Sequence, residues 1–416
     1  MTKALKRIAI LSVHTSPLHQ PGFGDAGGMN VYIAETAKRI AAQGIEVEIF
    51  TRATSAHDPE SVELAPGVLV RHVASGPFEG LSKEELPGQL CAVTAGLLRA
   101  EAAKSEGFYD LIHSHYWLSG QVGWLAKERW NVPLVHTMHT MARVKNAALA
   151  TGDSPEPVIR EIGEEQVVSI ADALVANTEQ EAGELVELYH AQPHRVHVVN
   201  PGVDLTAFRP GNKSEARKSL GINENSIVLL FVGRIQPLKA PDVLLKAAAQ
   251  LLQTHPQLKE NLVVAVCGGP SGSGLDEPEA LQKLSVELGI ESNVKFLPPT
   301  SRSKLPQVFQ AADLCIVPSH NESFGLVAVE AQACSVPVIA TRVGGLITTV
   351  ADGRSGILVT GHAPEVWAET VWQTLSNPDL MTRLQTGALG HAQTFSWDYT
   401  AKKLLETYRE VIEEKS

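Results

Sequence analysis

The chain has 416 residues, of which 44% are hydrophobic and 19% are charged, and its formal net charge is −11. This length accommodates two domains of about 200 residues, each with a sizeable hydrophobic core. The negative charge argues against nucleic acid or an anionic membrane as the main partner, because both carry negative charge themselves.

The amino-terminal sequence MTKALKRIAILSV begins with basic residues and continues with a short apolar run. That run is too short for the core of a signal peptide, and no stretch approaches the roughly 18 apolar residues of a membrane helix. The cysteines lack the spacing of a metal or redox site, which favours free thiols in a reducing compartment. We therefore expect a cytoplasmic protein.

Short β-rich runs alternate with helical patterns through the first half of the chain. We predict strands at 7–13, 45–51, 68–73, 109–113, 133–137, 173–176 and 196–199, and helices at 28–43, 82–105, 118–129, 157–170 and 179–189. Such alternation predicts a parallel, doubly wound sheet.

The sequence Pro201-Gly-Val-Asp204 interrupts this alternation, and residues 209–225 are typical of a linker with a short helix. The alternation then restarts, which predicts a second Rossmann-like sheet. Its expected strands are 227–232, 262–267, 294–297, 314–317 and 338–340. A last helix is expected after Phe395–Asp398.

The sequence of Pro318–Glu330, PSHNESFGLVAVE, lies between a predicted buried strand and a run with helical spacing. It predicts a strand-to-helix turn with Gly325 at the corner. Amides around Phe324–Leu326, at the start of that helix, favour phosphate. Glu322 in the turn suits sugar hydroxyls and Glu330 in the helix suits a ribose, so the pair favours a nucleotide-sugar. A glycosidase is the weaker alternative, because its two carboxylates come from separate elements.

The loop His14–Asn30 joins the first predicted strand to the first predicted helix. Gly27 and Gly28 let the backbone approach a ligand at the helix N-terminus. Gly22, Gly24 and Gly27 come close to the dinucleotide fingerprint G-x-G-x-x-G, but the loop is too long and lacks an acidic ribose binder after the second strand. The loop therefore predicts a ligand site other than one for NAD.

Arg234 and Lys239 follow the predicted strand 227–232 across a proline turn. Two cations at a strand end suit a diphosphate, because the leaving group gains negative charge as a glycosidic bond breaks. A solvated surface pair is the alternative.

Histidines mark the ends of two predicted strands, with His113 and His115 at one and His136 and His139 at the other. A metal site is one interpretation, although no carboxylate or cysteine accompanies them in a fixed pattern. Because ligands of doubly wound sheets bind at the carboxyl ends of the strands, these clusters together predict a cleft enzyme.

The Glu322 and Glu330 pair resembles the donor-sugar motif of glycosyltransferase family 4, and the resemblance covers nearly the whole chain. In particular, the chain resembles the D-inositol-3-phosphate glycosyltransferases of mycothiol synthesis. The resemblance implies an α/β GT-B fold, in which two Rossmann-like doubly wound domains face a central cleft. Residues 1–202 would bind the acceptor and residues 203–394 the nucleotide-sugar, while the last helix, 397–416, would pack back on the first domain.

The resemblance also implies roles for individual residues. It makes His139, Arg234, Lys239 and Glu322 catalytic, with His139 beside the transferred sugar. Donor contacts are implied for Gln20, Pro21, Gly28, Arg234, Lys239, Thr300, Glu322, Ser323, Phe324, Gly325, Leu326 and Glu330. Thr300 stands where relatives have arginine. Acceptor contacts are implied for His14, Asp25, Ala26, Gly27, Gly28, Met29, Asn30, Lys83, Tyr116, Thr140 and Arg160.

The implied reaction moves N-acetylglucosamine from UDP-GlcNAc to 1L-myo-inositol 1-phosphate, also named 1D-myo-inositol 3-phosphate, with retention of configuration. No catalytic metal is expected, because Arg234 and Lys239 would neutralise the diphosphate. The resemblance allows a structural Mg²⁺ held by backbone oxygens, and it implies a homodimer. The residues for that ion would be Phe309, Gln310, Ala312 and Val336.

Three alternatives stay open. A sucrose- or sucrose-phosphate-forming enzyme of the same family shares the carboxylate pair, but its glycine loop usually carries glutamine where this chain has Met29-Asn30. A UDP-GlcNAc 2-epimerase uses the same fold without an acceptor site. A nucleotide-sugar sensor would bind the donor without transferring the sugar.

Overall fold

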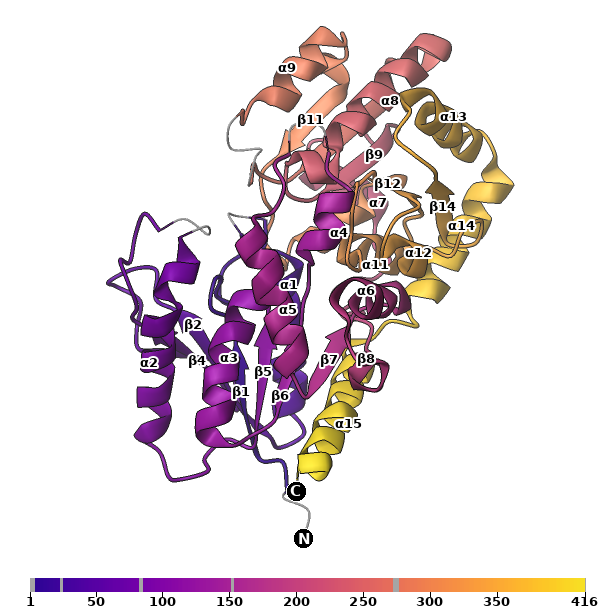
Figure 1. Ribbon diagram of the computed structural model, residues 1–416. Coiled ribbons are helices and arrows are strands. Elements are labelled where there is room, and N and C mark those ends of the chain that lie inside the picture. The colour runs from indigo at the N-terminus through magenta and orange to yellow at the C-terminus, as the bar shows by residue number, and fades with distance from the viewer. Residues whose placement is uncertain (1–3, 23–24, 82–84, 151–152, 272–276, 416) are drawn as a thin grey trace.

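The strands form two separate sheets, each flanked by helices, and these make the two domains of Figure 1. The structure, a computed structural model, describes residues 4–22, 25–81, 85–150, 153–271 and 277–415. None of the helices within these ranges is long and apolar enough to span a lipid bilayer.

The first sheet has eight strands in the order β3-β4-β2-β1-β5-β6-β7-β8. They are β1 (Arg7–Leu11), β2 (Glu46–Arg52), β3 (Ser61–Ala65), β4 (Val68–Val73), β5 (Leu111–His115), β6 (Leu134–Thr137), β7 (Ala173–Ala176) and β8 (Val196–Val198). The helices around it are α1 (Gly28–Ala41), α2 (Leu90–Ala102), α3 (Trp117–Trp130), α4 (Ala142–Ala147), α5 (Val158–Ile170) and α6 (Glu179–Tyr189).

Three expectations for this domain were wrong in detail. The sheet is not entirely parallel, because β3 and β4 form an antiparallel hairpin at its edge. The strand predicted at 109–113 is observed as β5 at Leu111–His115, since the side chain of Asp110 accepts hydrogen bonds from the backbone N–H groups of Lys6 and Arg7 beside it. In the described part of the helix predicted at 82–105, a short 3₁₀ turn at Leu86–Gln89, which contains Pro87, precedes α2, which starts at Leu90.

The second sheet has six strands in the order β11-β10-β9-β12-β13-β14, and all its pairs are parallel. They are β9 (Ile227–Val232), β10 (Leu262–Cys267), β11 (Val294–Leu297), β12 (Leu314–Val317), β13 (Val338–Thr341) and β14 (Gly356–Val359). Its helices are α7 (Lys213–Ser219), α8 (Pro241–Thr254), α9 (Ala280–Glu287), α10 (Leu305–Gln310), α11 (Leu326–Ala333), α12 (Leu346–Thr349), α13 (Pro364–Leu375) and α14 (Pro378–Ala392).

The strand order places the predicted motifs in space. In each sheet the order reverses beside the first strand, between β1 and β5 and between β9 and β12. Such a switch point opens a crevice at the carboxyl ends of the strands, where ligands bind in doubly wound sheets. The loop His14–Gly27 follows β1, whereas Arg234 follows β9 and Glu322 follows β12. The topology thus brings all three motifs to the carboxyl ends of the strands, where the two sheets face each other.

The last helix, α15 (Trp397–Lys415), leaves the second domain and runs along the first, in yellow in Figure 1. Its apolar side chains are buried with those of α1, β1 and β2, in one hydrophobic core. Tyr408 also places its hydroxyl 2.6 Å from Nδ1 of His113 in β5. This helix is therefore part of the first domain's core. Because burying one large apolar side chain contributes about 1.5–3 kcal/mol, the helix stabilises that domain. Its buried members are Trp397, Ala401, Leu404, Leu405, Tyr408, Val411 and Ile412.

Candidate active site

Asn30 organises the loop between β1 and α1. Its Oδ1 accepts a hydrogen bond from the backbone N–H of Gly27 (2.9 Å), while its Nδ2 donates to Oγ1 of Thr15 (2.9 Å) and to the carbonyl of Ser16 (2.7 Å). The side chain is only 1% exposed. Asn30 therefore positions the loop rather than presenting its amide to the cleft. Of the other predicted loop contacts, Gln20, Asp25 and Gly28 are exposed, Pro21, Gly27 and Met29 are half-buried, and Ala26 is buried.

The motif of the second domain has the predicted strand-to-helix form. Gly325 caps α11 with φ +96°, a conformation that favours glycine, and a Cβ built there would lie 2.8 Å from Cδ2 of Leu346, which would have to shift. The turn also meets the first domain, because Oγ of Ser323 donates a hydrogen bond to the carbonyl of His139. Across the same cleft, a Cβ on Gly28 would lie 3.4 Å from Cδ1 of Leu326.

Lys239 and Glu322 form an ion pair with 2.5 Å between Nζ and Oε1, and Oγ of Ser319 donates to the same oxygen at 3.2 Å. Arg234 lies nearby and is half-buried. Burial lowers its pKa, while the negative charges of Asp25 and Glu322 oppose that shift. A Cβ on Gly27 would lie 3.9 Å from its Nε. Arg234 therefore faces the glycine loop, and both predicted cations lie near the carboxylate of Glu322.

Glu330 lies in α11 and is 3% exposed. Its Oε1 is 2.5 Å from Nη1 of Arg302, whose guanidinium also lies 5.0 Å from the ring centroid of Phe208. Burial raises the pKa of Glu330, and the charge of Arg302 opposes the rise. The sequence interpretation missed Arg302. Thr300, the predicted donor contact in this loop, donates to the carbonyl of Pro298 at 3.1 Å.

Four of the predicted acceptor residues are brought together. Nη2 of Arg160 donates to Oγ1 (2.9 Å) and to the carbonyl oxygen (3.1 Å) of Thr140, and its guanidinium lies 4.9 Å from the ring centroid of Tyr116. The ring of His14 lies 4.3 Å from that of Tyr116. Composition alone suggests surface positions for these residues, yet Arg160 is only 2% exposed. Lys83 lies outside the described residues.

Two carboxylates that the sequence interpretation did not identify hold Arg160. Its Nη1 lies 2.8 Å from Glu156 Oε2 and its Nε lies 2.7 Å from Glu164 Oε1. Glu164 is fully buried and also accepts hydrogen bonds from Tyr189 and from the backbone N–H of Ala142. The spacing of four residues on either side of Arg160 in the sequence is the signal that could have found them.

His139 stands at the domain interface in the left-handed conformation, with φ +61°. Its Nε2 lies 2.9 Å from Nδ1 of His115, which is fully buried. Burial lowers the pKa of His139 to about 3, and the neighbouring His136 adds to the shift. The imidazole is therefore neutral at physiological pH, where it can position a sugar but does not act as a cation.

No group of three or more His, Cys, Asp or Glu side chains among the described residues could hold a metal ion, so the histidine cluster is not a metal site there. Of the positions expected for a structural Mg²⁺, Phe309, Ala312 and Val336 share one buried core. The carbonyl of Phe309 accepts a hydrogen bond from the backbone N–H of Ala312 (2.9 Å). The expected ligands are backbone oxygens, whereas Mg²⁺ is usually bound through carboxylates and phosphates. Within the described ranges, no group of three or more His, Cys, Asp or Glu side chains could hold it, so we assign the ion no step.

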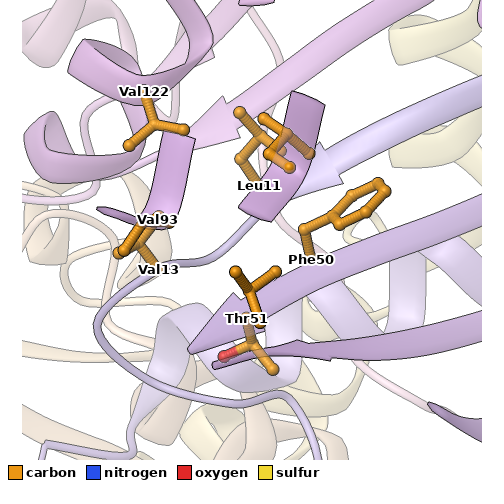
Figure 2. A pocket seen from close by; sticks show the side chains of 8 residues that line it. Leu11, Val13, Phe50, Thr51, Val93 and Val122 are labelled. Atoms are coloured by element: carbon orange, nitrogen blue, oxygen red, sulfur yellow. The ribbon is translucent and has the colours of Figure 1, made fainter. Parts of the chain in front are cut away.

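The pocket in Figure 2 is a different feature, inside the first domain. Its lining comes from β1, β2, β4, α2 and α3 and is apolar apart from Thr51. A substrate site also needs converging polar groups, so this pocket belongs to the hydrophobic core. The lining residues are Leu11, Val13, Phe50, Thr51, Val73, Val93, Leu97 and Val122.

Comparison with known proteins agrees with the two-domain site. The Glycosyl transferase 4-like domain matches residues 27–202, and the Glycosyl transferases group 1 family matches residues 212–389. The D-inositol 3-phosphate glycosyltransferase 2 of Catenulispora acidiphila is 62% identical over 409 residues, which cover 98% of this chain and 96% of that protein. The D-inositol 3-phosphate glycosyltransferase of Salinispora arenicola is also 62% identical, over 98% of this chain and 92% of its own.

Among solved structures, the sucrose-phosphate synthase of Thermosynechococcus elongatus superposes with a TM-score of 0.90 at 29% identity, over 98% of this chain and 100% of that one. Two Rossmann-like domains that close on a basic pair and a carboxylate pair define a GT-B glycosyltransferase. Within that class, the chain belongs to the D-inositol 3-phosphate glycosyltransferases of glycosyltransferase family 4.

Proposed function

We propose that this enzyme transfers N-acetylglucosamine from UDP-GlcNAc to 1D-myo-inositol 3-phosphate, giving an α-linked product and UDP in the first step of mycothiol biosynthesis. The observation that carries the acceptor is the cluster of Arg160, Thr140 and Tyr116. Glu156 and Glu164 hold Nη1 and Nε of Arg160 in this structure, so a phosphate monoester would have to take over part of the guanidinium. The two hydroxyl groups would assist it, and the phosphate would accept charge-assisted hydrogen bonds. The names of relatives at 62% identity support the same acceptor.

The donor would lie across the cleft on the second domain. Arg234 and Lys239 suit its diphosphate, and Glu322, held at 2.5 Å by Lys239, suits the sugar hydroxyls. Glu330 suits the ribose. Because the N-terminus of α11 begins beside Glu322, its unpaired N–H groups add partial positive charge near the phosphates.

The transfer step would use both substrates and no covalent intermediate on the protein. An inositol hydroxyl attacks the anomeric carbon on the face that the diphosphate leaves, which retains the configuration. The new C–O bond forms as the bond from the anomeric carbon to the β-phosphate oxygen breaks, and the electron pair stays on the diphosphate. A diphosphate oxygen takes the hydroxyl proton. The protein then contributes orientation and, through Arg234 and Lys239, charge stabilisation.

Mass spectrometry of products tests this proposal. UDP-GlcNAc and UDP-glucose are each offered with inositol 3-phosphate, free inositol and fructose 6-phosphate. We expect product from UDP-GlcNAc with inositol 3-phosphate, and very little with free inositol. A sugar phosphate product from UDP-glucose and fructose 6-phosphate alone would instead favour a sucrose-phosphate synthase, which the TM-score of 0.90 makes the second candidate. Release of free sugar without any acceptor product would reject a transferase acting on either acceptor.

A homodimer and a structural Mg²⁺ remain parts of the proposal that derive from family resemblance. Light scattering of the purified protein tests the first. Calorimetric titration with Mg²⁺ tests the second, and Gln310→Ala is the control because its backbone carbonyl remains.

A further inference from the structure

Three histidines form a column beneath the cleft, at the carboxyl ends of β5 and β6: the buried His113 and His115 and the half-buried His139. The buried His136 lies beside them in β6. The ring of His113 lies 4.1 Å from that of His115, and His115 contacts His139 at the cleft. His113 is itself held by Tyr408 of α15 (2.6 Å) and by Thr137 (2.8 Å). His139 thus contacts a stack of imidazoles whose positions are fixed by hydrogen bonds within the core.

All these rings are neutral. Burial lowers the pKa of His113 and of His115 well below the usual range, and it lowers those of His136 and His139 to about 3. A neutral imidazole carries one proton, so of the two nitrogens that meet between His115 and His139, one donates and the other accepts. The 2.9 Å contact joins Nδ1 of His115 to Nε2 of His139. The proton that they share decides the tautomer of both rings.

The other ring nitrogen of His115 decides which residue donates the hydrogen bond between His115 and His139. Nε2 of His115 is buried with no hydrogen-bond partner among the described residues. If Nε2 carried the proton, a buried N–H would lack an acceptor, and orphaned N–H groups are rarer in folded proteins than under-used acceptors. The proton of His115 therefore belongs on Nδ1, which donates to Nε2 of His139. His139 must then carry its own proton on Nδ1.

We propose that His115 is a positioning residue that sets the tautomer of His139, so that His139 presents Nδ1–H as a hydrogen-bond donor toward an oxygen of the transferred sugar. Nδ1 of His139 makes no hydrogen bond within the described part of the chain and is not one of its buried unpartnered atoms, so ligand can reach it. This inference rests on the proposed function, in which His139 lies beside that sugar.

The tautomer can be measured without turnover. Long-range ¹H–¹⁵N correlation spectra of ¹⁵N-histidine-labelled protein distinguish a protonated from an unprotonated ring nitrogen, and His139→Gln identifies the His139 signals by their loss. We expect the proton of His139 on Nδ1 and that of His115 on Nδ1. A His139 that carries its proton on Nε2 would overturn the proposal, whatever the activity.

Variants of His115 test the proposal through enzyme activity. His115→Asn places an amide where Nδ1 stood and should keep kcat/KM within about threefold, whereas His115→Leu should lower it about tenfold, the scale of one hydrogen bond. UDP affinity should be unchanged in both, and thermal unfolding shows whether each is folded. His136→Asn, at the next strand end, is the control: because His136 contacts Ser114 and not His139, this change should leave the tautomer of His139 as it is. A folded His115→Leu with wild-type kcat/KM and an unchanged His139 tautomer would also overturn the proposal.

The outcome is separable from a failure of the proposed function. If His139→Ala keeps full kcat/KM, His139 does not contact the sugar and its proposed role fails. The spectra would still report which nitrogen of His139 carries the proton in the wild type.

Discussion

Nη1 of Arg302 lies 2.5 Å from Oε1 of Glu330, and this carboxylate is only 3% exposed. A carboxyl group so far from water favours its neutral form, and burial accordingly raises the pKa of Glu330. The charge of Arg302 opposes that rise. Arg302 therefore favours the ionised form of Glu330, whose two oxygens both accept hydrogen bonds, as a ribose contact requires.

Arg302→Met should raise the pKa of Glu330 further. Donor affinity should then fall as pH is lowered from 8 to 6, by tenfold or more, because a protonated Glu330 loses acceptor capacity. Arg302→Lys should restore most of the affinity. Calorimetric titration with UDP-GlcNAc measures this, since its diphosphate, unlike the terminal phosphate of UDP, does not titrate in this range. An Arg302→Met variant with wild-type affinity at both pH values would contradict the argument.

The pair of Lys239 and Glu322 should act as one unit in turnover. Lys239→Ala is expected to lower kcat/KM by about 10²–10³, or about 3–4 kcal/mol, which is the scale of losing a group that stabilises developing negative charge. Glu322→Gln should also lower turnover, and the double variant should lose less than the sum because the two side chains are in contact at 2.5 Å.

Lys246→Ala serves as the control, because Lys246 pairs with Asp242 in a partly exposed ion pair of α8. Such pairs contribute about 0–1 kcal/mol. Fully additive losses for Lys239 and Glu322 would argue against a shared role.

Arg160 should select the phosphorylated acceptor. Arg160→Lys keeps a charge beside the buried Glu164 but loses the planar fork, so kcat/KM for inositol 3-phosphate should fall by about 2 kcal/mol, roughly thirtyfold. Donor affinity should stay as in the wild type. Kinetics with inositol 3-phosphate and free inositol measure the change, and an equal loss with both acceptors would point away from a phosphate contact.

Arg160→Ala is less informative, because it would leave Glu164 buried without its cation. Glu164 is fully buried and lies 2.7 Å from Nε of Arg160. Breaking such a pair costs about 3–5 kcal/mol of stability. Thermal unfolding of Arg160→Ala should therefore show a large loss, and Arg160→Ala combined with Glu164→Gln should recover part of it.

Glu181 should make the stability of the first domain depend on pH. It is 4% exposed in α6, and burial raises its pKa from 4.5 to about 7. Between these values the folded protein holds a proton on Glu181 that the unfolded chain releases, so the contribution of Glu181 to the free energy of unfolding should fall as pH rises through this window. The fall should approach about 3 kcal/mol, at about 1.4 kcal/mol per pH unit. The buried neutral histidines contribute in the opposite sense below their ordinary pKa of 6.5.

Glu181→Gln should remove this contribution, because the amide has no charge to bury, so the stability of the variant relative to the wild type should rise with pH across the window. Glu187→Gln, on the exposed part of the same helix, is the matched control and should keep it. Urea unfolding between pH 5 and 8 measures both. Parallel curves for the wild type and Glu181→Gln would show that Glu181 does not titrate in the window.

Much of the fold was predictable because local sequence patterns indicate where strands and helices begin and end. The strands Ala173–Ala176, Ile227–Val232 and Leu262–Cys267 are observed at their predicted bounds, since buried parallel strands are short apolar runs between turn residues. The antiparallel β3 was not predicted, because a five-residue edge strand with partly exposed side chains has no such run. The turn at Gly325 was predictable for a similar reason, because its glycine stands between an apolar strand and a helical run.

The sequence by itself determined the alternation of strands and helices, the two domains that this alternation implies, and the motifs at the strand ends. It could do so because periodicity and turn chemistry are local properties of the chain. Only the tertiary structure decided which side chains meet. Arg302 and Glu330 are 28 positions apart, His115 and His139 are 24 apart, and Lys239 and Glu322 are 83 apart. The order of strands and helices within each domain creates these contacts, because each pair lies inside one domain. The same burial that brings the groups together shifts their pKa values.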